Sequence, residues 1–170
     1  MFTTIPLTRD RNSAINAFDT LRFHALRALV WSKLTRRKTR LASFSEGSRS
    51  SVNRKFVGVQ EIPVEKIVGT LGREDDFDNK FRPLSNHLRD RWVDVFLNFS
   101  TEAWSPIRVH KIGEQYYVED GHHRTSVARA VGMTYIQAEI WEYSTRPVTV
   151  KFGQPVNCCP TNCPGESCAA

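Results

Sequence analysis

The chain has no cysteine in its first 157 residues, and this absence limits what can hold its core together. All four cysteines lie within the last 13 residues, at Cys158, Cys159, Cys163 and Cys168. A disulfide framework that staples the fold is therefore excluded. The four lack the Cys-x₂-Cys pair of a zinc ribbon. A wrapped metal ion, two small disulfide loops, a modification site and a reactive tail without function all stay open for this segment.

Long hydrophobic runs are also missing. No stretch of 18 apolar residues occurs, so we expect no transmembrane helix. The most apolar stretch near the start, Ala25 to Trp31, contains Arg27 and does not fit a secretory signal. An organelle transit peptide is the alternative for this Arg-rich leader. We expect a cytoplasmic protein with no membrane partner, because neither flanking aromatic residues nor a lipidation motif supports one.

Acidic residues are scarce in the first third of the chain. Residues 1–55 carry 12 Lys+Arg against 3 Asp+Glu, whereas residues 56–170 carry 12 against 15, and the formal net charge is +6. An anionic partner can therefore be argued for the first segment only. The hydrophobic share of 40% and the charged share of 25% predict a globular protein with a core.

The basic segment has the pattern of a long amphipathic helix. Asn12-Ser13 can cap a helix that runs to about Leu41. Apolar residues recur at helical spacing on one face, at Ile15, Phe18, Leu21, Ala25, Leu29 and Val30. The other face carries Arg22, Arg27 and Lys33. A Ser-rich linker over residues 45–53 follows the helix.

Two interpretations of this helix compete. A dense group of cations could neutralise nucleic-acid phosphates, with salt-sensitive and sequence-independent affinity, through Lys33, Arg36, Arg37, Lys38 and Arg40. In the other interpretation the apolar face packs on the domain or on a partner, and the charges are simply solvated. The length of the apolar face favours packing.

The remainder predicts one compact α+β domain over residues 55–143, between a helical extension with its linker (1–54) and a Cys-rich tail (144–170). The expected elements are a strand over 56–62, a turn over 64–67, a loop over 69–83, a helix over 84–99, strands over 107–112 and 115–118, a helix over 122–131 and a strand over 135–142. Gly113 marks a hairpin turn, and Gly132 ends the last helix.

The main candidate functional residues lie at 117–125, where a strand ends, a glycine turns the chain and a helix begins. The unpaired N–H groups of a first helical turn beside a glycine form an anion site. Arg124 can add a bidentate contact to a phosphate, and His122 and His123 can donate hydrogen bonds or move a proton. In the alternative, Asp120 caps the first turn and the histidines are merely solvated. A zinc site is not favoured, because neighbouring histidines point to different sides of a helix.

This corner, Asp120-Gly121-His122-His123-Arg124, followed by a short helix with Ala-Arg-Ala, resembles the ParB/sulfiredoxin superfamily. The resemblance covers about residues 56–143, including the entry Ile62-Pro63-Val64 to Ile67. Sulfiredoxins carry Gly-Cys-His-Arg at the corner, ParB partition proteins Gly-Glu-Arg-Arg, and free-serine kinases Asp-Gly-His-His-Arg. The loop over residues 72–78 is similar to that of short bacterial ParB-like proteins. The resemblance implies a small mixed sheet with packed helices.

Two activities of the superfamily are not expected here. Sulfiredoxin needs its cysteine, and His122 stands at that position. Partition ParB proteins continue into a helix-turn-helix domain and a dimerisation domain. The 27 residues after Tyr143 are too few for either of these, so a full partition function is not expected.

The resemblance implies a nucleotide site. The phosphates of ATP, ADP or CTP, with Mg²⁺, would lie over Asp120, Gly121, His122, His123, Arg124 and Thr125. Arg73 would bind a second anionic group, and an acidic loop would face the site with Glu74, Asp75, Asp76 and Asp78. The candidate catalytic residues are Asp76, Asp78 and His123.

The expected reaction is nucleotide hydrolysis or phosphoryl transfer to a small hydroxyl acceptor. For the loop, the alternative is a solvated acidic turn that Phe77 and Phe81 pin to the core. For the whole chain, the alternative is a non-catalytic regulatory module that binds DNA through residues 1–50.

Overall fold

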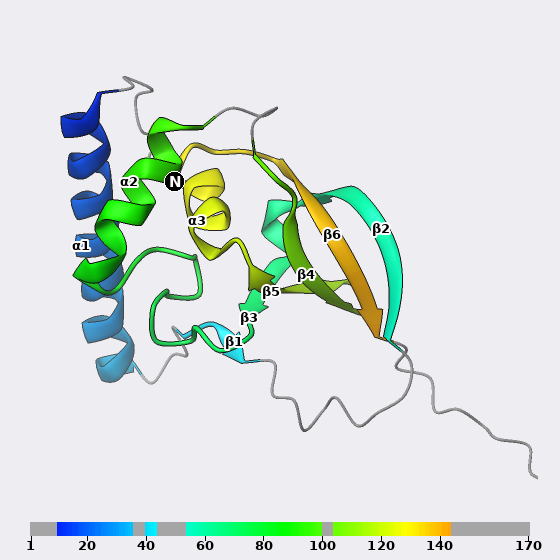
Figure 1. Cartoon of the computed structure of the whole chain (residues 1–170). Coiled ribbons are helices and arrows are strands. Elements are labelled where there is room, and N and C mark those ends of the chain that lie inside the picture. Colours follow the sequence, from blue (N-terminus) through cyan, green and yellow to red (C-terminus); the bar gives the residue numbers. More distant parts are fainter. Residues whose placement is uncertain (1–9, 36–39, 44–53, 100–103, 144–170) are drawn as a thin grey trace, which may run out of the picture.

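A computed structural model of the chain describes residues 10–35, 40–43, 54–99 and 104–143 (Figure 1). The four cysteines and the central part of the basic run (Arg36, Arg37 and Lys38) lie outside the described residues.

The described residues contain a six-stranded mixed sheet. Its strands are β1 (Ala42–Ser43), β2 (Arg54–Pro63), β3 (Ile67–Thr70), β4 (Ile107–Ile112), β5 (Gln115–Asp120) and β6 (Tyr135–Tyr143). The spatial order is β1-β3-β5-β4-β6-β2. The pairs β1–β3, β3–β5 and β4–β6 are parallel, whereas β4–β5 and β2–β6 are antiparallel.

Three helices pack in succession on one side of this sheet (Figure 1). They are α3 (His122–Ala130), which contacts β4, then α2 (Arg89–Leu97), and then α1 (Arg11–Thr35) as the outermost helix. Two short 3-10 turns, Val64–Lys66 and Asn86–Leu88, complete the elements. The fold is therefore α+β, with a mixed sheet, packed helices and a preceding N-terminal helix, as the sequence predicts.

Trp92 of α2 joins the three helices. Its buried indole lies 5.8 Å from the ring of Phe18 on α1 and stacks on Phe96 at 5.3 Å. The indole Nε1–H donates to Ser126 Oγ on α3 at 2.9 Å, so its one polar group is satisfied. Phe18 and Trp92 belong to one continuous hydrophobic core, and α1 is thus part of the packed structure.

The extent of α1 differs from the prediction. The described helix ends at Thr35, and Leu41 lies buried outside any helix. The next residues, Ala42–Ser43, form an edge strand beside Gly69 and Thr70. The expected assignment of faces also fails in part, because Val30 is 71% exposed. Apolar residues occupy both faces of this helix, so helical spacing alone could not say which face is buried.

Two further boundaries were wrong. The first two residues of the predicted loop over residues 69–83 belong to strand β3. This strand is four residues long and too short to show alternation. Helix α2 begins at Arg89 and not at Leu84, because a 3-10 turn precedes it. The hairpin of β4 and β5 is confirmed, with Gly113 at φ 58°, and α3 and β6 lie within two residues of their predicted limits.

Among the helices of the described residues, none has the length and apolar character needed to cross a membrane.

Candidate functional site

The corner between β5 and α3 is built around Gly121. This residue caps the helix with φ 97° and ψ 25°, a left-handed conformation that favours glycine. A Cβ at this position would overlap the side chain of Ile107 on β4. The alternative in which Asp120 caps the first turn is not found, since no side chain caps α3. The corner thus brings the backbone of Gly121 close to the Ile107 side chain and leaves the start of α3 without a side-chain cap.

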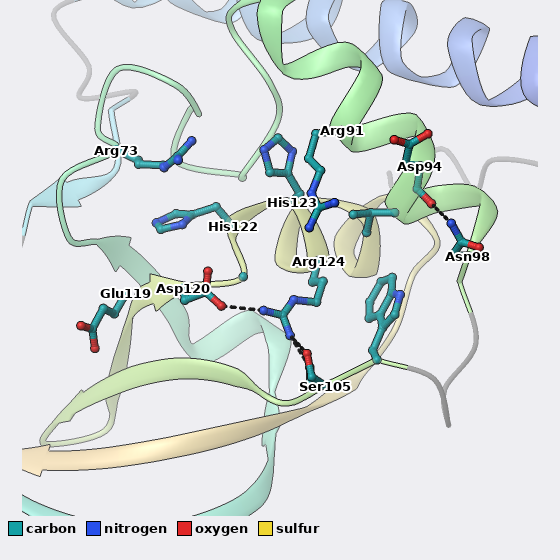
Figure 2. Close-up of a pocket in the computed structure, with 13 residues that line it drawn as sticks. Arg73, Arg91, Asp94, Asn98, Ser105, Glu119, Asp120, His122, His123 and Arg124 are labelled. Atoms are coloured by element: carbon teal, nitrogen blue, oxygen red, sulfur yellow. Dashed lines mark hydrogen bonds and ion pairs between the residues drawn. The ribbon is translucent and has the colours of Figure 1, made fainter.

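A cleft of about 470 Å³ opens on the start of α3. Its walls come from the end of β5, one side of α2, the loop after β3 and the segment before β4 (Figure 2). The lining residues are Arg73, Arg91, Asp94, Val95, Asn98, Trp104, Ser105, Glu119, Asp120, Gly121, His122, His123 and Arg124. The structure therefore brings Arg73 together with Asp120 to Arg124, as the sequence predicts.

Both histidines at the corner are held against Phe77. The His122 ring stacks on the Phe77 ring at 6.2 Å, and the His123 ring meets it edge-on at 5.7 Å. His122 Nε2 shares a hydrogen bond of 2.6 Å with Thr70 Oγ1. The buried Nδ1 of His123 has no hydrogen-bond partner among the described residues. One imidazole is thus tied to the sheet, and the other keeps an unused polar atom beside the cleft.

The histidines are neutral near pH 7. Burial, followed by the positive charge of Arg73, lowers the pKa of each from 6.5 to about 4. The charge of Arg91 acts in the same direction on His123, whereas Asp76 raises the pKa of both. At neutral pH the imidazoles can donate or accept hydrogen bonds, but they add no positive charge to the cleft.

The positive charge of the cleft comes instead from Arg73 and Arg91, which lie on either side of the two histidines (Figure 2). Arg73 Nη1 donates to Asp76 Oδ2 at 3.1 Å. Arg91 projects from α2 and forms no recorded ion pair within the described ranges. Two guanidinium groups and a helix start converge here, which is an arrangement suited to an anionic ligand.

The guanidinium group of Arg124 is bonded to other residues of the protein and is not free to bind a ligand in the cleft. Its Nη1 donates to the carbonyl and hydroxyl oxygens of Ser105, the latter at 2.7 Å, and to the Pro106 carbonyl at 3.1 Å. Its Nη2 contacts Asp120 Oδ2 at 2.7 Å (Figure 2). The guanidinium therefore fixes the segment before β4 to the corner, and this use was not expected from the sequence.

Thr125 is likewise a structural residue. Its side chain is fully buried, and its hydroxyl donates to the Gly121 carbonyl at 3.1 Å. Its backbone N–H donates to the same carbonyl at 2.9 Å. The structure thus contradicts the expectation that Thr125 contacts phosphate.

The four carboxylates of the acidic loop have different roles. Asp78 is fully buried and accepts from Arg82 Nε and Nη2 at 2.7 and 2.5 Å. The backbone N–H groups of Lys80 and Arg82 also donate to Asp78, which closes the turn. The catalytic role expected for Asp78 is therefore contradicted, because no part of its carboxylate is accessible.

The other carboxylates of this loop mostly face away from the cleft. Glu74 accepts from the Ser43 hydroxyl at 2.5 Å, and Asp75 pairs with Arg40 at 3.0 Å on the surface. Asp76 lies near both histidines, as its effect on both pKa values shows, whereas Glu74 interacts with His122 alone. The alternative of a turn pinned by Phe77 and Phe81 is confirmed in its packing, since both rings are buried.

Sequence reasoning missed the α2 wall of the cleft. Its residues recur at helical spacing on one side of α2, at Arg91, Asp94, Val95 and Asn98. Polar residues on the side opposite Trp92 could have signalled a second functional face. Trp104 contacts Phe99 edge-on at 5.2 Å, and it also lines the cleft.

The basic residues proposed for nucleic acid are only partly described. Lys33 is exposed in the last turn of α1, and Arg40 pairs with Asp75. The nucleic-acid interface stays a prediction. Within the described residues, no group of three or more His, Cys, Asp or Glu side chains could hold a metal ion without further ligands.

No family model and no curated protein matches the chain. Among solved structures, the chain is similar to sulfiredoxin from Arabidopsis thaliana at 25% sequence identity. The match covers 48% of this chain and 82% of the sulfiredoxin chain, with a TM-score of 0.32. The α+β class assigned above rests on this chain's own sheet and helices.

Proposed function

We propose that the cleft binds a nucleotide, with its phosphates over the start of α3. The observation that carries this proposal is the convergence of the open helix start at Gly121 with the guanidinium groups of Arg73 and Arg91 in one cleft. Phosphate oxygens accept hydrogen bonds from backbone N–H groups and, more strongly, from guanidinium groups. The volume of about 470 Å³ lies in the usual range for small-molecule sites.

The far end of the cleft suits the base of a nucleotide. Val95 and Trp104 supply apolar surface there, and the contact with Phe99 fixes the indole. An aromatic ring beside aliphatic carbon is a surface on which a base can stack. Asn98 adds a side-chain amide that can donate or accept a hydrogen bond. These residues support a nucleotide over a simple phosphate.

The residues present also fit a nucleotide-bound Mg²⁺. Mg²⁺ is commonly held by one or two carboxylates together with substrate phosphates. The carboxylates of Asp94 and Asp120 line the cleft, and Asp120 lies directly before the helix start. Asp120 would hold the ion together with phosphate oxygens, and the ion would neutralise phosphate charge. The protein's own residues would orient the phosphates through Arg73, Arg91 and the first turn of α3.

Phosphoryl transfer to a small hydroxyl acceptor is the reaction that the corner motif implies. With Asp78 buried, Asp76 is the carboxylate of the acidic loop that can accept a proton near the cleft. His123 would line the site as a neutral imidazole, with its Nδ1 buried away from the ligand. A pKa of about 4 makes this imidazole no stronger a base than an ordinary carboxylate. We assign the proton to Asp76 because the acidic loop brings this carboxylate to the histidines, and we assign positioning to His123.

Calorimetric titration with ATP, ADP and CTP, with and without Mg²⁺, tests the nucleotide site. The informative variant is Arg91→Ala, because Arg124→Ala would also release Ser105. We expect Arg91→Ala to weaken binding about 10- to 100-fold, the usual value of a charge-assisted hydrogen bond. Arg89→Ala is the matched control, since Arg89 lies on the same helix outside the cleft. A folded protein that binds none of the three nucleotides would contradict the proposal.

A second assay tests turnover once binding is established. The protein is incubated with the bound nucleotide, Mg²⁺ and serine, and both phosphate release and phosphoserine are measured. We expect Asp76→Asn to retain nucleotide binding and to lose product formation. Product formation by Asp76→Asn at the wild-type rate would remove Asp76 from the reaction.

A further inference from the structure

Helix α1 carries a second apolar face that no part of the described structure covers. Four large side chains in its last four turns are between 59% and 78% exposed: Phe23, Val30, Trp31 and Leu34. Leu26 is exposed beside them, at 39%. A contiguous group of exposed apolar side chains is typical of an interaction surface.

These residues share one side of the helix. At about 100° per residue, Phe23, Val30 and Leu34 fall within roughly 40° of one another, with Leu26 and Trp31 at the margins. The buried residues Ala14, Phe18 and Ala25 lie on the opposite side, against α2. Figure 1 shows α1 as the outermost helix, so this second face points away from the rest of the fold.

Cations outnumber acids around this face. On the described helix Arg27 and Lys33 are exposed there, together with one acid, Asp19, which lies one turn before Phe23. The Arg27 guanidinium sits 5.7 Å over the Phe23 ring, among the exposed apolar residues. A partner for this surface must therefore accept apolar side chains and also place anionic groups within reach of Arg27 and Lys33.

A second copy of the chain does not meet this requirement. Two α1 helices packed through these apolar residues would bring Arg27 and Lys33 of one helix close to those of the other, and the exposed acid of this face, Asp19, lies two turns before Arg27 and does not pair with them. A nucleic-acid backbone supplies the anionic groups but gives no apolar medium for Val30 and Leu34. An anionic lipid surface supplies both, because acyl chains take up the apolar residues and headgroups pair with the cations.

We propose that α1 is an interfacial helix that lies flat on an anionic membrane, with the domain held on its other face. Phe23, Val30 and Leu34 enter the acyl region, Trp31 lies at the headgroup level, and Arg27 and Lys33 contact lipid phosphates. A helix in this orientation does not cross the bilayer. The proposal departs from the expectation of no membrane partner, because that expectation placed Val30 on the buried face.

Co-sedimentation of the full chain with vesicles tests this proposal. One set contains phosphatidylcholine alone, and the other contains phosphatidylcholine mixed with phosphatidylglycerol. We expect binding to the mixed vesicles, little binding to the neutral ones, and a blue shift of tryptophan emission that disappears in Trp31→Phe. The double substitution Val30→Ser with Leu34→Ser should lower the partition coefficient about 100-fold, since each buried side chain is worth roughly tenfold.

Val59→Ser is the matched control, because Val59 is also exposed but lies on β2. It should bind vesicles like the wild type. Two results would overturn the proposal. One is equal sedimentation with both vesicle types. The other is unchanged binding of the Val30→Ser with Leu34→Ser variant, which would assign the affinity to the basic run alone. Dimerisation or duplex-DNA binding that the same double substitution abolishes, without vesicle binding, would assign the face to those partners instead.

Discussion

Because they are buried, His122 and His123 have lower pKa values than exposed histidines. Each ring is packed against Phe77 and lies close to Arg73, and both effects favour the uncharged imidazole. A cleft built for phosphate would be expected to use charged histidines. Here the charge is supplied by arginines, which keep it at every physiological pH. Anion binding in the cleft should therefore be insensitive to histidine titration above pH 6.5.

Stability, by contrast, should depend on these two residues. In the unfolded chain the histidines titrate near 6.5, and in the folded chain near 4. Between these values the unfolded state binds more protons, so the free energy of unfolding must fall as the pH is lowered from 6.5 towards 4. Urea denaturation at a series of pH values checks this. His122→Gln with His123→Gln should flatten the slope in the upper part of that window, where carboxyl groups have not begun to titrate. A slope unchanged by the two substitutions would contradict the prediction.

The two carboxylates Asp78 and Asp75 provide a matched comparison of buried and exposed ion pairs. Asp78→Asn leaves the largely buried Arg82 without its counter-charge, and we expect a loss of about 3 kcal/mol in the free energy of unfolding. Asp75→Asn breaks an exposed pair with Arg40 and should cost less than ~0.5 kcal/mol. Denaturant unfolding measures both. Equal costs for the two variants would show that Asp78 has no special structural role.

At the scale of elements, the strand–glycine–helix corner is the part that the sequence predicts best. Alternation identifies β5, the glycine identifies the turn, and Gly132 identifies the end of α3, because each signal is local. The use of Arg124 could not be predicted in the same way. Its partners Ser105 and Pro106 lie 19 and 18 residues away and reach it only through the pairing of β4 with β5. The α2 wall was missed for the same reason.

The burial of Asp78 shows the other limit of sequence reasoning. A cluster of four carboxylates indicates an acidic surface, but it cannot say which one turns inward. That depends on Arg82, four residues later, and on two backbone N–H groups oriented by the turn. Phe77 and Phe81 on either side of the turn draw this part of the loop into the core. The burial of Phe77 and Phe81 thus explains why Asp78, which lies between them in the sequence, is buried as well.

Substitution of Gly121 tests the corner itself. Gly121→Ala places a methyl group against Ile107 and forces a left-handed conformation on alanine, so we expect a loss of more than about 2 kcal/mol in stability. Gly132→Ala carries only the conformational cost of roughly 1 kcal/mol, because open space surrounds Gly132 at φ 78°. Thermal unfolding compares the two. If Gly132→Ala proves the more harmful, the close approach of the corner to β4 is not what requires glycine.

At the scale of the whole molecule, α1 and the sheet domain share one core through Phe18 and Trp92. We expect a single cooperative unfolding transition that includes α1. Phe18→Ala should lower the stability of the entire protein by about 3 to 5 kcal/mol, the usual cost of emptying a buried aromatic site. Phe23→Ala, on the exposed side of the same helix, should leave stability nearly unchanged. Circular dichroism and tryptophan emission should report the same midpoint, and separate midpoints would make α1 an independent appendage.

Strand β1 is only two residues long, yet the chain passes through it directly between α1 and the rest of the sheet. Gly69 lets it lie against β3, and Arg40 and Ser43 hold the loop that carries Arg73 through Asp75 and Glu74. Undocking of β1 would release two of this loop's partners at once. The outer helix is thus connected to the cleft through β1 as well as through its packing on α2, which forms one wall of the cleft. Any influence of one on the other that travels through β1 must be equal in both directions.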